Sequence, residues 1–464
     1  MLCSKSKIKM AYVPTRRETD VYPPPEPAYE SRDIVWARLK DIFAGIHNLE
    51  IVGIEWLNKE GILWDPRDVK RVAEYMKTQQ VDCLFMPHVN FGCEEVCGML
   101  GKALGVPFLL WGPRDDVPPE DLTVDRPLDI QCGLFATSMV LRRYQVPFTY
   151  IENCWLDSPA LTKGIEDFVR VASVVKAFRG LRVGQISTRP RPFLSVKVNE
   201  GELLERFGIE IVPINGQEFM NTVRDVLATE TEALDAEIRV IHEQVDCSAV
   251  SEEYVRNTAA LVLTYLRLAE RYECTAFASE CWEVIPQNLD IWPCYAFGRL
   301  GDLGLNVACE NDLHNAISCE LAAAAARWET PAFTADLTIR HPFNDNSELL
   351  WHCGPFPRSL AKEGTHPCMV GKCVGQYEIR GGDLTMVRLG ASDGKYSLLA
   401  EEVKGCEGPI TNGNYIWVET ENWVELEKKF IYGPYIHHVA GIHGKWKNVL
   451  REALKYINGI DLDE

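Results

Sequence analysis

Two acidic residues in the second half of the chain each follow a short apolar stretch that is typical of a buried strand. Glu310 comes after residues 307–309, and Asp336 comes after residues 333–335. A carboxylate at the end of a buried strand is costly to desolvate unless a cation, a proton or several hydrogen bonds compensate its charge. Two such groups that converge could bind a divalent metal through their oxygens, or act as an acid and a base. The alternative is that both residues cap helices or form ion pairs.

Histidines in the same half of the chain would complement these carboxylates. Imidazole nitrogen and carboxylate oxygen together suit Mn²⁺, Co²⁺ or Zn²⁺. His437 and His438 are adjacent near the C-terminus, and a strand end there would turn only one of them inward, because successive side chains point to opposite faces. His352 is a further candidate. Each of the three could instead be a core histidine or an exposed one.

The bulk composition excludes several classes of protein. With 464 residues the chain exceeds the size at which one core keeps growing, so we expect two or three domains. The net charge of −19 argues against a nucleic-acid partner, because it would repel phosphates. No apolar run approaches the roughly 20 residues of a membrane-spanning helix, and residues 1–7 lack a signal-peptide core. We therefore expect a cytoplasmic protein with no membrane partner.

The cysteines and glycines show no recognised ligand-binding pattern. The sixteen cysteines are scattered, many of them in apolar stretches, and are most simply buried reduced thiols. They lack a paired CxxC set, so we expect no zinc or iron–sulfur site. Neither a GxGxxG nor a Walker phosphate loop is present, so we expect no nucleotide binding.

Strand-like and helical segments alternate from the N-terminus to about residue 308. This alternation predicts parallel sheets with helices on both faces, in two successive α/β domains at residues 1–175 and 176–328. Ligands of such sheets bind at the carboxyl ends of the strands. Arg16, Asn90 and Trp111 each follow a predicted strand and are candidates, although each alone is more simply a loop or packing residue.

Past Asp336 the pattern changes to short strands separated by turns that contain glycine. The predicted strands are residues 374–379, 384–389, 395–402 and 415–418. The turn pairs between them are Gly381-Gly382, Asp393-Gly394 and Asn412-Gly413. This spacing predicts an antiparallel β-unit, either a small barrel or a sandwich, in residues 329–464.

A series of short motifs follows along the chain, and their order and spacing are specific although each alone is weak. They are Asn90-Phe91-Gly92, Leu109-Leu110-Trp111-Gly112-Pro113, residues 132–138 and 147–150, Arg189-Pro190, Glu280-Cys281-Trp282, Cys309-Glu310-Asn311-Asp312, Ala335-Asp336, His352-Cys353-Gly354 and His437-His438. With them the chain resembles the L-fucose isomerase and L-arabinose isomerase superfamily, and most closely its shorter fucose isomerase-like members. The resemblance covers nearly the whole chain.

The resemblance implies two doubly wound parallel-sheet α/β domains followed by a C-terminal antiparallel β-barrel-like domain. It also implies aldose–ketose isomerisation with Mn²⁺, with Co²⁺ or Mg²⁺ as alternative metals. Glu310 matches the glutamate that binds the metal and exchanges a proton, and Asp336 matches the second carboxylate ligand. His438 is our choice for the histidine ligand, with His437 as the alternative, and His352 matches a ligand of the arabinose branch alone. Family members assemble as oligomers, commonly hexamers, in which neighbouring subunits contribute to each active site.

The implied reaction moves a proton between C2 and C1 of a sugar through an enediol. A metal would polarise the carbonyl and stabilise the enediolate charge, while Glu310 and Asp336 act as base and acid. A hydride shift is the competing mechanism, and the pair of carboxylates favours the enediol route.

Departures from the family pattern bear on the substrate. Glu280 stands where many relatives carry glutamine, next to Trp282, and Arg191 is an additional arginine beside Arg189. Arginine binds phosphate, carboxylate or sulfonate oxygens in a bidentate way, whereas the alternative is that these cations balance an acidic protein. The predicted substrate-binding residues are Arg16, Asn90, Trp111, Arg189, Arg191, Glu280, Trp282 and His437.

The resemblance, together with these arginines, suggests a specific substrate. Isomerases of this superfamily interconvert sulfoquinovose and 6-deoxy-6-sulfofructose, and they are similar in size to this chain. We therefore take sulfoquinovose as the substrate hypothesis. The alternatives are a neutral sugar (L-fucose, D-arabinose or L-arabinose), a non-catalytic sugar-binding protein, and a metal-dependent hydrolase or aldolase.

Overall fold

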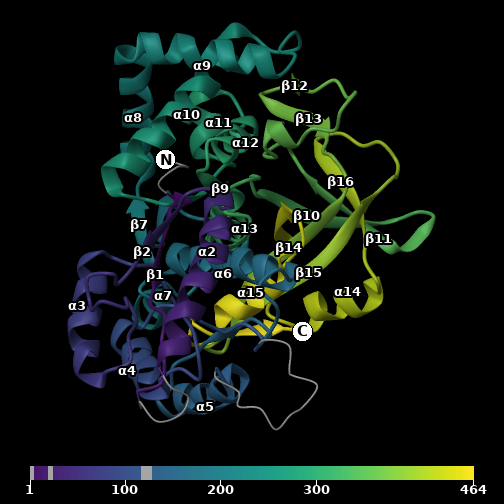
Figure 1. The fold of residues 1–464 in the computed structure, drawn as a ribbon. Coiled ribbons are helices and arrows are strands. Elements are labelled where there is room, and N and C mark those ends of the chain that lie inside the picture. The colour runs from purple at the N-terminus through teal and green to yellow at the C-terminus, as the bar shows by residue number, and fades with distance from the viewer. Residues whose placement is uncertain (1–4, 19–24, 116–127) are drawn as a thin grey trace. The chain divides into compact units, whose positions relative to one another are not determined.

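The computed structural model describes residues 5–18, 25–115 and 128–464, which form two compact units (Figure 1). The N-terminal unit comprises Ser6–Lys176 and Glu452–Asn458. The C-terminal unit comprises Ala177–Arg451 and Gly459–Glu464, together with Lys5. Among the described helices, none combines the length and the apolar character that crossing a membrane requires.

The N-terminal unit is built on a parallel sheet with the strand order β2-β1-β3-β4-β5. Its strands are β1 (Ile8–Tyr12), β2 (Leu49–Val52), β3 (Cys83–Pro87), β4 (Phe108–Trp111) and β5 (Thr149–Tyr150). Its helices are α2 (Glu26–Gly45), α3 (Val69–Thr78), α4 (Glu94–Leu104), α5 (Ile130–Arg143) and α6 (Pro159–Arg179).

The central strand β3 shows why helices cover both faces of this sheet. All of its residues are buried, and alternate side chains enter two separate cores. Leu84 and Met86 pack with residues of α3 and α4, whereas Cys83 and Phe85 pack with residues of α2 and α6. Two-sided burial of this kind produces the unbroken apolar run of a parallel strand, as the sequence predicted.

The C-terminal unit begins with a second parallel sheet, of strand order β7-β6-β8-β9. Its strands are β6 (Arg182–Ile186), β7 (Glu210–Ile214), β8 (Ala276–Ser279) and β9 (Asn306–Ala308). The helices of this part are α7 (Glu200–Phe207), α8 (Gly216–Thr229), α9 (Thr231–Gln244), α10 (Glu252–Tyr272), α11 (Val284–Leu289), α12 (Cys294–Asp302) and α13 (Leu313–Ala325).

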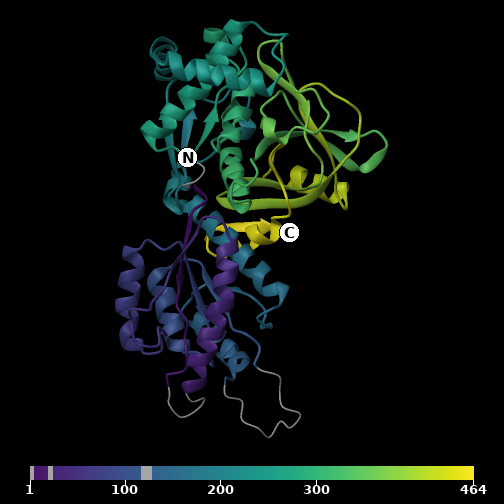
Figure 2. The ribbon, with the colours of Figure 1, turned by 45° about the horizontal axis from the view of Figure 1, so that its top comes forward.

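An antiparallel barrel completes the C-terminal unit. Six strands run in the order β16-β11-β10-β17-β14-β15, and pairing of β15 with β16 closes the circle. Figure 2 shows these green and yellow strands curving around one centre. Their bounds are β10 (Phe333–His341), β11 (Asn344–His352), β14 (Asp383–Ser392), β15 (Lys395–Cys406), β16 (Asn414–Glu419) and β17 (His438–His443). The predicted fold class, parallel α/β sheets followed by an antiparallel barrel-like domain, is confirmed.

Three shorter strands extend the barrel sheet, and two further helices belong to the C-terminal part of the chain. The strands are β12 (Cys368–Val370), β13 (Val374–Glu378) and β18 (Ile460–Asp463), and the helices are α14 (Trp423–Tyr432) and α15 (Lys447–Leu454).

Helix α13 joins the parallel sheet of the C-terminal unit to the barrel. Every one of its residues is buried, and its small and apolar side chains fit a helix that packs on all sides. It contacts β8 and β9 on one side and β14 and β17 on the other. Asn315 donates a side-chain hydrogen bond to Thr334 of β10 (3.1 Å), and Ser318 accepts one from the backbone N–H of Leu389 in β14 (2.8 Å).

One sequence-based expectation about Asp336 is wrong in detail. The short apolar strand does not end there, because β10 continues to His341 and pairs with β11 over that length. Asp336 therefore lies within a barrel strand, opposite Trp351 of β11 and His438 of β17. Strand β11 was not predicted, because its first residues, Asn344–Ser347, are polar and resemble a loop.

Gly133 is required by close packing within the N-terminal unit. It lies in α5, and a Cβ at this position would come within 1.7 Å of the backbone oxygen of Phe91. We predict that Gly133→Ala lowers the free energy of unfolding by about 1–3 kcal/mol, because the backbone must shift. Gly45, at the end of α2, has nothing within 4 Å of an added Cβ. Gly45→Ala should be neutral or slightly stabilising, and equal thermal stability of the two variants would contradict the packing argument.

Candidate metal and active site

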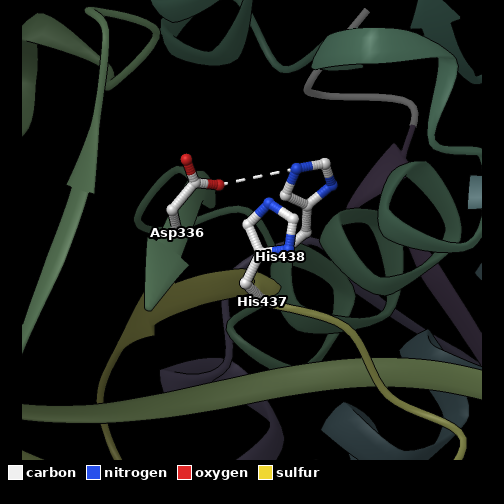
Figure 3. A group of neighbouring side chains, drawn as sticks. All are labelled: Asp336, His437 and His438. Atoms are coloured by element: carbon white, nitrogen blue, oxygen red, sulfur yellow. Dashed lines mark ion pairs between the residues drawn. The ribbon is translucent and has the colours of Figure 1, made fainter. Parts of the chain in front are cut away.

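Four side chains from four separate elements converge in the C-terminal unit. Glu310 lies in the turn after β9, Asp336 in β10, and His438 is the first residue of β17. His438 Nε2 is 3.0 Å from Glu310 Oε2 and 3.5 Å from Asp336 Oδ1. Asp336 Oδ1 is also 4.0 Å from Nε2 of His352, at the end of β11. Figure 3 shows the ion pair between Asp336 and His438.

His437 and His438 have different environments, as the alternation of a strand end predicted. His438 is fully buried, whereas His437 is exposed and its ring lies 5.7 Å from the ring of Phe193. One ligand-type atom from each of Asp336, His437 and His438 lies within 4.8 Å of the others. This set overlaps with the one that contains Glu310. We favour the Glu310 set, because its atoms are the more deeply buried.

The buried atoms of this cluster suit a divalent cation. Asp336 Oδ1, His352 Nε2 and His438 Nε2 are buried and have no hydrogen-bond partner among the described residues. Leaving a buried polar atom unpaired costs about 1–3 kcal/mol. Carboxylate oxygens and imidazole nitrogens are the ligands that Mn²⁺ and related divalent ions accept. The donor set therefore fits the metal that the family resemblance implies.

The turn that carries Glu310 has a strained backbone. Glu310 and Asn311 have φ values of 59° and 62°, and two successive non-glycine residues in this left-handed region cost about 1–3 kcal/mol each. Asn311 donates a side-chain hydrogen bond to the backbone oxygen of Ile186, at the end of β6 (2.9 Å). Trp282 Nε1 donates to Glu310 Oε1 (3.1 Å). These two bonds hold the turn so that Glu310 Oε2 faces His438.

Asp312 and Arg388 lie behind His438. Asp312 is completely buried, and its Oδ2 accepts hydrogen bonds from His438 Nδ1 (2.8 Å) and Arg388 Nη1 (2.6 Å). Burial would raise the pKa of Asp312, but Arg388 and His438 outweigh burial and hold that pKa far below its ordinary value. Burial likewise opposes protonation of His438, yet its contacts with Asp312 and Glu310 raise its pKa to about 9.

A cavity of about 350 Å³ opens onto this cluster. Its wall includes Glu310, Asp336, His352 and three indole side chains. The indoles are those of Trp282, Trp292 and Trp351. Phe193 stacks on Trp282 at 6.0 Å and lies 5.4 Å from the ring of His438, so the loop after β6 borders the cluster. Cys353, also in the wall, has its Sγ 3.1 Å from that of Cys294.

The predicted substrate-binding residues of the C-terminal unit have different surroundings. Trp282 lines the cavity. Arg189 donates from Nη1 to backbone oxygens of its own loop, and Arg191 is exposed on that loop. Glu280 is buried, and its carboxylate accepts hydrogen bonds from the backbone N–H groups of residues 282–284 at the start of α11. Glu280 therefore stabilises a helix start beside the cavity.

Three predicted residues belong to the N-terminal unit. The guanidinium of Arg16 packs over the ring of Trp64 at 4.2 Å. The side-chain oxygen of Asn90 accepts from the backbone N–H groups of Arg17 and Gly92. Trp111 is fully buried at the end of β4. The loops after β1 and β3 are thus joined at the carboxyl edge of this sheet.

Sequence reasoning assigned no role to Asp312 or Arg388. Asp312 belongs to the motif Cys309-Glu310-Asn311-Asp312, and in the structure it also caps α13 by accepting a hydrogen bond from the backbone N–H of Asn315. Arg388 is a single cation within an apolar stretch of β14, and that isolation is the signal that could have identified it.

Comparisons with known proteins find similar sequences among sugar isomerases. The family described as "Fucose/sulfoquinovose isomerase, N-terminal domain" matches residues 14–179. Proteins named sulfoquinovose isomerase from Priestia aryabhattai and Priestia megaterium are each 24% identical to this chain over 424 residues, covering 87% of this chain and 92% of theirs. The protein of that name from Alkalicoccus urumqiensis is 23% identical over 386 residues, covering 81% and 85%.

The solved structures add nothing to these matches. A putative response regulator with a GGDEF domain and an ABC-transporter solute-binding protein from Actinobacillus succinogenes align with TM-scores of only 0.19 and 0.17.

Fold and site together define a two-part α/β and β-barrel protein with a carboxylate–imidazole centre. The sequence matches support a sugar isomerase that is similar to the fucose isomerase-like family.

The raised pKa of His438 predicts how the stability of the metal-free protein depends on pH. An ordinary histidine in the unfolded chain has a pKa near 6.5, whereas His438 has a pKa of about 9 in the folded protein. The stabilising contacts of its protonated form are therefore complete below about pH 6.5 and are lost as pH rises through 9. We expect the urea midpoint of chelator-treated protein to fall over this range. In His438→Gln the fall should be smaller, and an unchanged pH dependence in that variant would contradict the assignment.

Proposed function

We propose that this chain is an aldose–ketose isomerase that depends on a divalent cation, Mn²⁺ by ligand type, held by Glu310, Asp336 and His438. His352 is the proposed fourth ligand. The observation that carries the proposal is the convergence of two carboxylates and two imidazoles around buried atoms that lack hydrogen-bond partners in the described chain. The isomerase names of the relatives support the same reaction class.

In the proposed mechanism the two carboxylates move protons. When bound, the cation would hold neighbouring oxygens of the sugar and polarise its carbonyl group. Glu310 takes the proton from the hydroxyl-bearing carbon next to the carbonyl, and Asp336 serves the two oxygens, so that the carbonyl oxygen gains a proton and the neighbouring hydroxyl oxygen loses one. Return of the proton from Glu310 to the former carbonyl carbon completes the enediol route. Burial opposes ionisation of Glu310, but its contact with His438 lowers its pKa, so it is ionised, as a base must be.

The wall of the cavity would orient the sugar. The indoles of Trp282, Trp292 and Trp351 line the cavity, and aromatic faces pack well against the C–H face of a sugar ring. Trp282 also donates its N–H to Glu310, which leaves the second oxygen of that carboxylate directed at the cluster. The same side chain therefore contributes to the wall and holds the proposed base.

Sulfoquinovose is the substrate that we propose, with 6-deoxy-6-sulfofructose as product. Relatives that align over most of this chain carry the name sulfoquinovose isomerase, which supports the proposal. Arg191 is the proposed sulfonate contact, because it is exposed on the loop whose Phe193 stacks on Trp282. A guanidinium can bind a sulfonate through two parallel hydrogen bonds.

A neutral sugar is the second candidate substrate, and one observation favours it. The cavity-lining residues that the structure describes include neither arginine nor lysine. L-fucose, D-arabinose and L-arabinose would need no cation there.

Removal of either carboxylate tests the reaction class. We predict that Glu310→Gln or Asp336→Asn lowers kcat by about 10²–10⁴-fold or more, because each change removes a proton-transferring group and a proposed ligand. Glu237→Gln, which alters a buried carboxylate paired with Arg299, should keep wild-type turnover. The measurement is ketose formation by chelator-treated protein with and without added Mn²⁺. Turnover that needs no metal, or wild-type rates in either site variant, would reject the proposal.

A panel of sugars tests the substrate. The Mn²⁺-loaded protein is assayed with sulfoquinovose, L-fucose, D-arabinose and L-arabinose, and we expect the highest kcat/KM with sulfoquinovose. Arg191→Gln should lower kcat/KM for sulfoquinovose by about 10- to 100-fold, because it removes a hydrogen-bonded contact to a charged group. The kcat/KM for neutral sugars should not change. Arg224→Gln, on the exposed face of α8, is the matched control. Turnover of a neutral sugar alone would replace the proposed substrate.

A further inference from the structure

The geometry points to Asp312 as the residue that positions His438 and fixes the tautomer of its imidazole ring. This inference rests on the proposed function, because it concerns a proposed metal ligand, but it adds a residue outside the cavity lining and outside the proposed ligand set. Among the hydrogen bonds of Asp312 in the described part of the chain, the bond to His438 connects it to the centre.

Each hydrogen-bond partner that the structure describes for the Asp312 carboxylate is a donor. Oδ2 accepts from His438 Nδ1 at 2.8 Å and from Arg388 Nη1 at 2.6 Å. Oδ1 accepts from the backbone N–H of Asn315 at 3.0 Å, which caps α13. Both oxygens must therefore be acceptors, and a carboxylate meets that demand. An asparagine amide does not, because either orientation sets its NH₂ group against a donor.

The contact with Asp312 decides which imidazole nitrogen faces the centre with a lone pair. A proton on Nδ1 is held by Asp312, which leaves Nε2 of the neutral ring free to accept. Nε2 is the atom that lies 3.0 Å from Glu310 and 3.5 Å from Asp336. The opposite tautomer would place a proton between His438 and these carboxylates and prevent Nε2 from binding a metal.

Arg388 balances the charge of Asp312 without entering the cluster. Its side chain is 3% exposed and the side chain of Asp312 is fully buried, so their charges are compensated mainly by each other. Glu310 and Asp336 then present two negative charges to the centre, which is the charge that one divalent cation neutralises. The strand that carries Arg388 is fixed to α13 next to this pair, through the bond from Leu389 N–H to Ser318 Oγ.

A merely structural role for Asp312 is the competing explanation, because the residue also caps a helix and forms a buried ion pair. The two explanations differ in what they predict for metal binding. A structural residue would alter stability alone. A positioning residue alters the affinity for a cation that it does not touch, and only while His438 is present.

The experiment measures Mn²⁺ binding by the chelator-treated full chain, from the loss of the electron paramagnetic resonance signal of free Mn²⁺. We expect Asp312→Asn to raise the Kd for Mn²⁺ by about 10- to 100-fold. Two controls should stay within about two-fold of wild type. Ser251→Ala removes a comparable cap, from α10, and Glu237→Gln disrupts a comparable buried ion pair with Arg299.

A second variant tests the same inference in case Asp312→Asn fails to fold. In Asp312→Ser/Arg388→Met, serine can still cap α13 and both buried charges are removed together, which is far less destabilising than removing one. The Kd should again rise by about 10- to 100-fold. In a His438→Gln background, adding Asp312→Asn should change the Kd by less than about two-fold.

Some outcomes would overturn the inference. They are a wild-type Kd in both Asp312 variants, an equal loss of affinity with and without His438, and the absence of Mn²⁺ binding by wild-type protein. Failure of the proposed function gives a different result, in which Mn²⁺ binding depends on Asp312 but no aldose is isomerised.

Discussion

The site in the C-terminal unit depends on the buried carboxylate of Asp312. Its three donors come from α13, β14 and β17, which are brought together only when the barrel packs on that helix. A buried charge that loses its partners costs several kcal/mol, so the three elements must keep their relative positions closely. The same restraint places His438 beside Glu310 and Asp336. The packing of α13 against the barrel therefore also fixes the positions of the polar groups at the site.

The local parts of the fold could be predicted from the sequence. The alternation of segments indicated parallel sheets, and the turn pair Asp393-Gly394 indicated a hairpin. Ser392 pairs with Lys395 across that turn, and φ is positive at both central residues, as a tight two-residue hairpin requires. The closure of the barrel through β15 and β16 and the polar start of β11 were not predicted. Both depend on pairing between distant segments, which the local pattern does not encode.

The chemistry of the site could be predicted better than its support. Glu310, Asp336 and the paired histidines were singled out because of their residue types, and the structure brings Glu310, Asp336 and His438 together. The support was missed for physical reasons. The backbone at Glu310 is left-handed, but no glycine stands there to indicate this conformation in the sequence. Glu280 was expected to contact the substrate, whereas its carboxylate accepts hydrogen bonds from backbone N–H groups. The metal, the assembly and the three-domain boundaries stay predictions.

Closure of the barrel leaves little backbone at which another strand could add. The ends of the nine-stranded sheet are β12 and β18, of three and four residues, and acidic Asp461 and Asp463 lie on the latter. Short and charged edges resist edge-to-edge pairing. Copies of this sheet should therefore meet through side-chain surfaces rather than by pairing their edge strands into a continuous intermolecular sheet.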